Sequence, residues 1–440
     1  MSGSTTDTRR WARPTEDRLD GPQKSLPAVA DGRTVAEFLA GRPRLSEFST
    51  PLLVLDDAAL ADNTGRMATW CAEHGVELAP HGKTTMAPDL WRRQLDAGAW
   101  GITVATGTQL WVAVAAGVSR VQLANALVDP AALARLAGLL DADPELDVLS
   151  WADSVDTVAA MESALAAVAP TRPDPARPLT VLVELGAPGG RTGARDLATA
   201  QAVADAVTAA PHLQLAGVAG YEGALAHDAG PAALTAVRGY LRQLVELHLA
   251  LRDAGAYPGR AVVTAGGSAF FDDVAEVLAP LASDVPGSDT TVLLRSGAYQ
   301  VHDDGFYRGI SPLSRAGSTG PPFRSAMHAW ARVVSRPEPG LVLLDAGKRD
   351  VPFDEGLPEP QLAAEQLGSP PRPLAGEITA VNDQHAFLRL DPTDPLRVGQ
   401  VVRLGLSHPC TAFDKWRWIP VVEGTDEPDP VVVELVRTYF

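Results

Sequence analysis

The sequence predicts an α/β fold, a (β/α)8 TIM barrel followed by a C-terminal all-β domain, and three observations support this prediction. Nine short apolar runs between residues 52 and 294 alternate with Ala- and Leu-rich helical patterns. This alternation is typical of a parallel sheet covered by helices. Nearly every run ends in polar or glycine-containing sequence. From about residue 323, short apolar runs are separated by Pro, Gly and Asp without a long helical pattern, which predicts a second, all-β domain.

The nine apolar runs are three to six residues long, and we interpret them as strands. They lie at residues 52–55, 76–79, 101–105, 121–124, 147–150, 179–184, 215–219, 261–264 and 292–294, with helical patterns such as 131–140 and 155–168 between them. Because nine runs are one too many for the barrel, we interpret 52–55 as a lead-in strand. An open doubly wound sheet is the alternative, but it would gather its unusual residues near one switch point. Here they follow most of the strands, as in a barrel.

This interpretation divides the chain into four parts. Residues 1–32 are rich in Ser, Thr, Asp, Arg, Gly and Pro and are predicted to form a disordered tail. Residues 33–56 form a lead-in segment that can join the β domain. Residues 57–322 form the barrel and 323–440 the β domain, with strands expected near 327–334, 340–344, 374–381, 386–390 and 400–404.

Composition narrows the class of protein. The chain has 440 residues, 46% of them hydrophobic, and a net charge of -17. Such an acidic chain is a poor partner for nucleic acid or an anionic membrane, and no apolar run is long enough to span a bilayer. With two cysteines, no disulfide framework and no secretory signal at the start, we expect a protein of the cytoplasm.

Lys83 is the most informative residue of the chain. It follows the apolar run 76–79 and stands directly after Gly82. A lysine at a strand end, beside a residue without a side chain, leaves room for a flat ring. This is what a Schiff-base lysine carrying pyridoxal 5'-phosphate (PLP) requires. A solvated loop lysine is the simpler interpretation of this segment taken alone.

Two later strands end in segments suited to binding a phosphate. Gly266, Gly267 and Ser268 follow the run 261–264, whereas Ser296, Gly297 and Tyr299 lie after the run 292–294. Glycines let backbone N–H groups approach an oxyanion, and the hydroxyl groups add donors. Each segment alone is more often a tight turn, but two on late barrel strands predict a phosphate site.

A glycine-flanked arginine is the next candidate. Arg191 lies in the stretch 189–193, where three glycines surround Arg191 and Thr192. Its guanidinium could hydrogen-bond the phenolate oxygen of the cofactor ring and tune its electronics. The alternative is a surface arginine in a flexible loop.

His408 and Cys410 are candidate metal ligands. We expect them on a strand, where residues i and i+2 face the same side, with Pro409 placing that strand at an edge. Imidazole and thiolate suit zinc, with manganese and magnesium as alternatives. Two protein ligands would leave positions open for water or substrate. A buried cysteine beside an unrelated histidine is the competing interpretation.

Taken in order, these motifs resemble those of the D-serine dehydratase / D-threonine aldolase family of alanine-racemase-like, fold-type III PLP enzymes. The segments are 80–84, 191–193, 266–268, 296–299, 345–347 and 408–410, and the resemblance spans roughly residues 46–440. It implies a PLP-binding barrel, a β domain carrying the metal, and a homodimer. The family's aldolases have His-x-Asp where this chain has His408-Pro409-Cys410, which favours a dehydratase. Segments 79–88 and 99–103 look most like the bacterial amino acid deaminase branch.

The resemblance implies a lyase that converts a β-hydroxy D-amino acid, D-serine or D-threonine, to a 2-oxo acid and ammonia. Lys83 would remove the Cα proton, Arg191 would contact the ring phenolate oxygen, and Tyr221 would face the ring or its nitrogen. The metal would stabilise the departing hydroxide. Two alternatives stay open: a retro-aldol cleavage to glycine and an aldehyde, and a non-catalytic PLP-binding protein.

Overall fold

The structure is a computed structural model that describes residues 16–283, 290–315, 317–318, 320–424 and 427–440. By internal contacts the chain divides into two units. Among the described residues, unit 1 contains 68–83 and 94–297, and unit 2 contains 16–67, 84–93 and 298–440. Segments 57–67 and 84–93, predicted as part of the barrel, contribute Ala59, Leu60, Ala87 and Leu90 to the core of unit 2.

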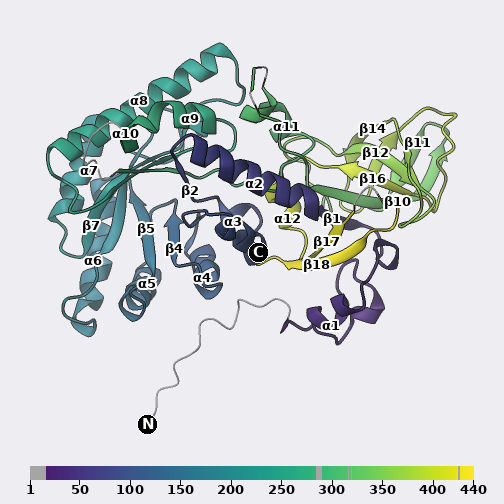
Figure 1. The fold of residues 1–440 in the computed structure, drawn as a ribbon, viewed down its shortest axis with the longest axis horizontal. Coiled ribbons are helices and arrows are strands. Elements are labelled where there is room, and N and C mark those ends of the chain that lie inside the picture. Colours follow the sequence, from purple (N-terminus) through teal and green to yellow (C-terminus); the bar gives the residue numbers. More distant parts are fainter. Residues whose placement is uncertain (1–15, 284–289, 316, 319, 425–426) are drawn as a thin grey trace, which may run out of the picture. The chain divides into compact units, whose positions relative to one another are not determined.

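Unit 1 is a curled, all-parallel sheet, which confirms the predicted barrel (Figure 1). Its strand order is β2-β9-β8-β7-β6-β5-β4-β3, and a parallel bridge between His81 and Thr103 joins its two ends. The strands are β2 (Glu77–Leu78), β3 (Ile102–Val104), β4 (Arg120–Leu123), β5 (Asp147–Ala152), β6 (Leu179–Leu185), β7 (Leu213–Gly220), β8 (Ala261–Ala265) and β9 (Thr290–Leu294).

Helices follow most of these strands, as the alternating pattern predicted. They are α4 (Gly107–Ala115), α5 (Pro130–Ala142), α6 (Val155–Val168), α7 (Leu197–Ala209), α8 (Pro231–Asp253), α9 (Phe271–Leu278) and α10 (Pro280–Ser283). Two more helices, α2 (Asp57–Glu73) and α3 (Pro88–Asp96), each have residues assigned to both units.

Several of the polar residues that follow strands begin the next helix. Thr106 accepts a hydrogen bond from the backbone N–H of Gln109 at 3.3 Å, and Ser154 accepts one from Thr157 at 3.1 Å. Such N-caps satisfy donors that the first helical turn leaves free. Part of the polar sequence at the strand ends therefore starts helices, and only the remainder can form a site.

Unit 2 is built on a ten-stranded, largely antiparallel sheet, which confirms the all-β prediction (Figure 1). Its strands are β1 (Leu52–Asp56), β10 (Met327–Glu338), β11 (Leu341–Leu344), β12 (Glu359–Ala364), β13 (Arg372–Pro373), β14 (Glu377–Val381), β15 (Ala386–Arg389), β16 (Val401–Gly405), β17 (Trp418–Glu423) and β18 (Val431–Arg437). The helices α1 (Val35–Ala40), α11 (Phe306–Ile310) and α12 (Pro409–Phe413) also belong to this unit.

The lead-in run forms β1, which pairs antiparallel with β10 and parallel with β17. Its side chains alternate between two cores: Leu53 and Leu55 belong to one cluster, and Leu52 and Val54 to another. A strand buried on both faces reads as a continuous apolar run. For this reason the sequence of β1 is hard to distinguish from that of a barrel strand.

The beginning of the chain differs from the predicted tail. Residues 1–15 lie outside the described part. Residues 16–32 are instead part of unit 2, since Leu19 is fully buried in one of its core clusters and its N–H donates to the carbonyl of Arg33 at 2.8 Å. One buried leucine in a polar stretch was too weak a signal to predict this contact.

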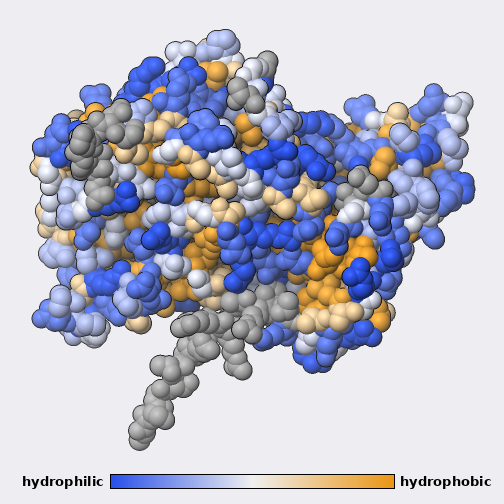
Figure 2. Space-filling view, viewed as in Figure 1, coloured by the Kyte–Doolittle hydropathy of each residue, from blue (hydrophilic) through white to orange (hydrophobic). Residues whose placement is uncertain are grey.

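Hydrophilic residues cover most of the face seen in Figure 2. Within the described ranges, none of the helices combines the length and the apolar character that a bilayer crossing needs.

Candidate functional site

Lys83 lies at the carboxyl end of the barrel strands. It sits in the short 3-10 turn Gly82–Thr84, which follows β2. Around it the backbone N–H of His81 donates to the carbonyl of Arg295 at 3.1 Å, and that of Ala79 donates to Leu294 at 2.8 Å. The turn is thus fixed to the end of β9, the position from which barrel enzymes present functional residues.

Lys83 is also the only lysine of unit 1. The chain has four lysines in all, Lys24, Lys83, Lys348 and Lys415, and the other three belong to unit 2. Lys24 forms an ion pair with Asp350 at 2.6 Å, and Lys415 pairs with Asp414 at 3.0 Å. Among the lysines of the chain, Lys83 is therefore the candidate for an amine that reacts with a carbonyl cofactor in the barrel.

Three positive charges converge on the same end of the barrel. Burial, and then the charges of Lys83, Arg295 and Arg191, hold the pKa of His81 well below its usual value. His81 is therefore a neutral imidazole at pH 7. A cluster of cations around a neutral ring suits an anionic ligand such as a phosphate or a carboxylate.

The structure brings Arg191 and Tyr221 together, although 30 positions separate them in the sequence. The Arg191 guanidinium lies 4.7 Å from the centroid of the Tyr221 ring. Glu184 and Asp153 anchor the loop that carries Arg191: Thr192 Oγ1 donates to Glu184 Oε1 at 2.7 Å, and Gly193 N–H donates to Asp153 Oδ2 at 3.3 Å. Arg191 is thus an exposed residue on a loop that these two hydrogen bonds fix in place.

Glu222 accepts hydrogen bonds from the backbone N–H groups of the two glycines that we predicted to bind a phosphate. Its carboxylate is fully buried and accepts from Gly266 N–H at 2.9 Å and from Gly267 N–H at 2.6 Å. A phosphate in this loop would therefore bind to its remaining groups, or would displace the carboxylate. Glu222 directly follows Tyr221, but nothing in the sequence linked it to glycines 44 positions away.

The other candidate phosphate residues lie as follows. Ser296 Oγ donates to the carbonyl of Gly267 at 3.2 Å, which joins the two predicted loops next to Ser268. A Cβ on Gly297 would lie 2.5 Å from the carbonyl oxygen of His81, so the glycine allows a close backbone approach. Tyr299 belongs to unit 2, where it is buried with its ring 5.9 Å from that of Phe323.

Sequence reasoning missed Arg295, which is 2% exposed. Its guanidinium donates to Thr264 Oγ1 at 2.7 Å and to the carbonyl of Gly220 at 2.6 Å, and it lies 4.9 Å from the Trp151 ring centroid. Burial lowers the pKa of Arg295, opposed chiefly by the charge of Glu222. The available signal in the sequence was a charged residue directly after the apolar run of β9.

The barrel interior fits a polar, ring-shaped cofactor. Among the described residues of unit 1, four buried polar atoms have no hydrogen-bond partner: His81 Nδ1, Gln122 Nε2, Trp151 Nε1 and Arg295 Nε. Buried polar atoms without partners are rare in folded proteins and call for an explanation such as a ligand. With Lys83, Arg191 and Tyr221 at the same end of the barrel, the residues suit PLP.

We expect Glu222→Ala to destabilise the protein. The substitution leaves two buried N–H groups without an acceptor, at about 1–3 kcal/mol each. A thermal melt should show a Tm lower by about 5–10 °C, and Glu222→Gln, which keeps one acceptor, should lose about half as much. Glu276→Ala is the matched control, because that side chain is 62% exposed. Equal Tm values for Glu222→Ala and this control would contradict the assignment.

The predicted metal ligands lie close together but not on a strand, so that part of the prediction is wrong. His408 is the N-cap of α12, with φ 42°, and Cys410 is in the first turn of this helix. Pro409 takes the first helical position, where its missing N–H costs nothing and its fixed φ suits the helix. The proline that suggested an edge strand therefore starts a helix.

Neighbouring side chains orient both residues. His408 Nδ1 lies 2.6 Å from Asp354 Oδ2, and Thr411 Oγ1 donates to the other oxygen of Asp354 at 2.7 Å. The Cys410 thiol donates to Thr84 Oγ1 at 3.6 Å, and Thr84 directly follows Lys83 in the chain. The hydrogen bond with Cys410, opposed by burial and supported by Asp354, raises the pKa of His408 to about 9.

The donor set fits a cation held by two protein ligands. Histidines that bind metals usually engage their other ring nitrogen with a carboxylate, as His408 does with Asp354. No group of three or more His, Cys, Asp or Glu residues that could enclose a metal occurs in the described parts of the chain. A cation here would complete its coordination with water or substrate, as catalytic sites do.

Comparison with known proteins agrees with the fold. Residues 326–422 match the family model of the serine dehydratase domain. D-threonine aldolase from Arthrobacter sp is 28% identical over 376 residues, which cover 84% of this chain and 88% of that protein. 3-hydroxy-D-aspartate aldolase from Paracoccus denitrificans (strain Pd 1222) is 26% identical over 318 residues, covering 71% and 76%.

Solved structures give the same result. D-threonine aldolase from Filomicrobium marinum has a TM-score of 0.72 at 26% identity and covers 90% of this chain and 96% of its own. D-threo-3-hydroxyaspartate dehydratase from Delftia sp. HT23 has a TM-score of 0.69 at 21% identity, covering 90% and 99%, and alanine racemase from Bacillus anthracis has 0.56 at 15%, covering 88% and 97%. The last two comparisons concern the fold.

The combination of a barrel and a β sheet is that of the alanine-racemase-like fold. Within it, the chain is similar over most of its length to D-threonine aldolase and 3-hydroxy-D-aspartate aldolase, and part of its β unit matches the serine dehydratase domain. The resemblance predicted from the sequence motifs is thereby confirmed.

Proposed function

We propose that the protein is a PLP-dependent lyase that dehydrates a β-hydroxy D-amino acid, with D-serine as the first candidate. The observation that carries the proposal is the placement of Lys83, which is the only lysine of a barrel whose carboxyl end also holds Arg191, Arg295 and unpaired polar atoms. The relatives named D-threonine aldolase and 3-hydroxy-D-aspartate aldolase support a β-hydroxy D-amino acid as the substrate class.

Each candidate residue has a role in this proposal. When bound, PLP supplies an electron sink for the negative charge that develops on the substrate Cα. Lys83 Nζ takes the Cα proton as general base. Arg191, whose guanidinium lies over the Tyr221 ring, is assigned to the phenolate oxygen of the PLP ring. Ser268, Ser296 and the surrounding backbone are assigned to the phosphate, with Gly266 and Gly267 shaping the loop around Glu222.

His408 and Cys410 are assigned to a divalent cation that supplies Lewis acidity for the departing hydroxide. Substrate loses a Cα proton and a β-hydroxide, and water then hydrolyses the released enamine. D-serine therefore gives pyruvate and ammonia in equal amounts. His-x-Cys in place of His-x-Asp favours this outcome over a retro-aldol cleavage, which the aldolase relatives make the second candidate.

We further propose zinc as the cation, a homodimer as the assembly and the cytoplasm as the location. Imidazole with thiolate favours zinc among the available divalent metals. Neither Cys71 nor Cys410 forms a disulfide among the described residues, which suits a reducing compartment. Manganese or magnesium would be expected only if oxygen ligands from water and substrate dominated the site.

The test compares the two enantiomers of serine. We expect the purified protein with PLP and zinc to release pyruvate and ammonia from D-serine and at least about 100-fold more slowly from L-serine, since one base acts on one face of the cofactor. Lactate dehydrogenase with NADH reports pyruvate, and an ammonia assay runs in parallel. Equal rates on both enantiomers, or no release from either, would refute the proposal.

A further inference from the structure

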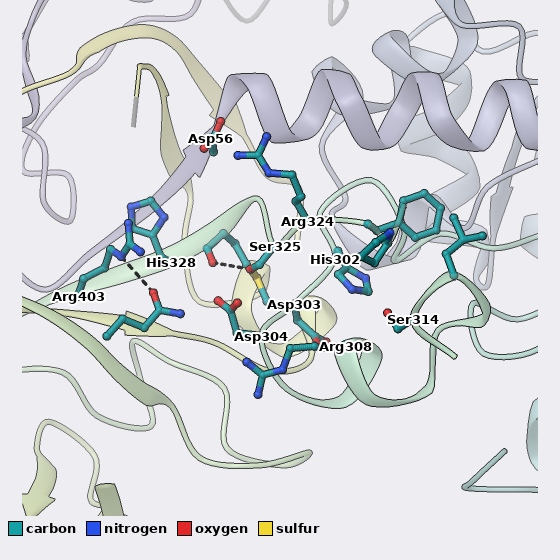
Figure 3. Close-up of a pocket in the computed structure, with 15 residues that line it drawn as sticks. Asp56, His302, Asp303, Asp304, Arg308, Ser314, Arg324, Ser325, His328 and Arg403 are labelled. Atoms are coloured by element: carbon teal, nitrogen blue, oxygen red, sulfur yellow. Dashed lines mark hydrogen bonds between the residues drawn. The ribbon is translucent and has the colours of Figure 1, made fainter. Parts of the chain in front are cut away.

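A cavity lies wholly within unit 2, and none of the candidate catalytic or metal residues lines it. Its volume is about 710 Å³, well within the range of small-molecule sites. The lining side chains come from the end of β1, from residues 302–325, and from β10, β12 and β16 (Figure 3). The cavity is therefore a feature of the β unit itself.

The lining is charged but formally balanced. Three arginines face it, Arg308, Arg324 and Arg403, and three aspartates, Asp56, Asp303 and Asp304. Figure 3 shows the Arg324 side chain reaching toward Asp56, with Asp304 and Arg308 beside each other on the opposite side. The three carboxylates would repel a simple anion, and the three guanidinium groups would repel a simple cation.

Most of these charges already have structural partners. Arg308 forms a two-fold contact with Glu359 at 2.7 and 3.1 Å. Asp303 accepts four backbone N–H groups at 2.9–3.4 Å, from Gly305, Tyr307, Arg308 and His408. Charges satisfied in this way shape the cavity, so recognition falls to the remaining groups.

Three groups remain for recognition: Arg324, His302, and Asp304, whose hydrogen-bond partners Ser325 and Gln361 carry no charge. Within the described ranges the Arg324 guanidinium makes no hydrogen bond or ion pair, although its backbone is fixed by Asn63 Oδ1 at 2.9 Å. His302 is 2% exposed, and its Nε2 likewise has no hydrogen-bond partner among the described residues. Burial lowers the pKa of His302 to about 4, so its ring is neutral at pH 7. A buried, unpaired imidazole nitrogen in a cavity wall calls for a polar ligand.

From this arrangement we infer that the cavity is a second small-molecule site, separate from the barrel, which binds a free zwitterionic amino acid. The ligand carboxylate pairs with Arg324, because a guanidinium binds carboxylates with two parallel hydrogen bonds. The ligand ammonium pairs with Asp304, whose carboxylate lies across the cavity beside Ser325 and Gln361. His302 Nε2 contacts the ligand side chain. The inference does not depend on the reaction proposed for the barrel.

The experiment is a calorimetric titration of the full-length holoenzyme with L-serine, which the proposed reaction converts at least about 100-fold more slowly than D-serine. We expect saturable binding of one L-serine per chain. Arg324→Ala and Asp304→Asn should each weaken it by about tenfold or more, the equivalent of one lost charged contact. Acetate and ethylamine, each carrying half of the zwitterion, should bind more weakly than L-serine.

Controls separate this site from the barrel. Arg349→Ala removes an arginine that is 71% exposed and lies outside the cavity, and it should leave binding unchanged. Lys83→Ala should also retain binding, so the result can be read whether or not D-serine is turned over. Absence of saturable binding, equal affinity in Arg324→Ala, or tighter binding of inorganic phosphate than of L-serine would each overturn the inference. Circular dichroism checks that the variants fold.

Discussion

Lys83→Ala is expected to fold normally and to lose the covalent cofactor adduct that borohydride traps in the wild-type protein. Borohydride reduces the bond between a lysine amine and the cofactor to a stable link, which a peptide map then locates. The chain has only four lysines, and Lys83 alone belongs to the barrel. Turnover should fall by at least about 10²–10⁴-fold, because the same amine is the assigned general base.

The matched control for this prediction is Lys348→Ala. Lys348 belongs to unit 2, where its ammonium lies 5.5 Å from the Phe353 ring centroid, and we expect its substitution to leave the trapped adduct in place. The adduct is read by absorbance and mass spectrometry, so this result does not require turnover. An adduct that maps to Lys24, Lys348 or Lys415 would refute the role of Lys83.

His408→Ala and Cys410→Ala are each expected to remove the metal while the cofactor stays bound. With only two protein ligands, loss of either leaves a single donor, which cannot compete with water for zinc. Metal content by atomic emission should fall from about one per chain to near zero, whereas the cofactor absorbance should persist. Asp354→Ala should weaken metal binding by about 10–100-fold, since it removes the hydrogen bond that orients His408.

Cys71 supplies the control for the metal variants because it is the only other cysteine. Burial raises the pKa of its thiol to about 12, so it stays protonated and does not bind metals. Cys71→Ala should therefore keep the full metal content. Wild-type metal content in both His408→Ala and Cys410→Ala would show that the cation is held elsewhere.

The barrel strands were predictable because each is a buried apolar run followed by a polar break. The sequence did not predict four strands of unit 2. Three of them, β12, β13 and β17, each contain a proline (Pro360, Pro373 and Pro420), whereas β18 contains none. Proline argues against a strand when only the local sequence is considered. In the folded protein, pairing with neighbouring strands outweighs this local preference.

The candidate site shows a similar division. Lys83, Arg191 and His408 could be identified because an unusual residue stands at the end of an apolar run or among glycines. Glu222 and Arg295 were missed, since each acts through partners that are far away in the sequence, although Arg295 also stands at the end of an apolar run. The i, i+2 spacing identified His408 and Cys410 as a pair, although the pair starts a helix and not a strand.

The central claim is that the bond from Cβ to oxygen breaks, and D-threonine tests it most directly. Both candidate reactions accept this substrate, but their products share no compound. We predict 2-oxobutanoate and ammonia in a one-to-one ratio when the holoenzyme with zinc is incubated with D-threonine and the products are separated by chromatography. Glycine and acetaldehyde without ammonia would contradict the account, because they require cleavage between Cα and Cβ.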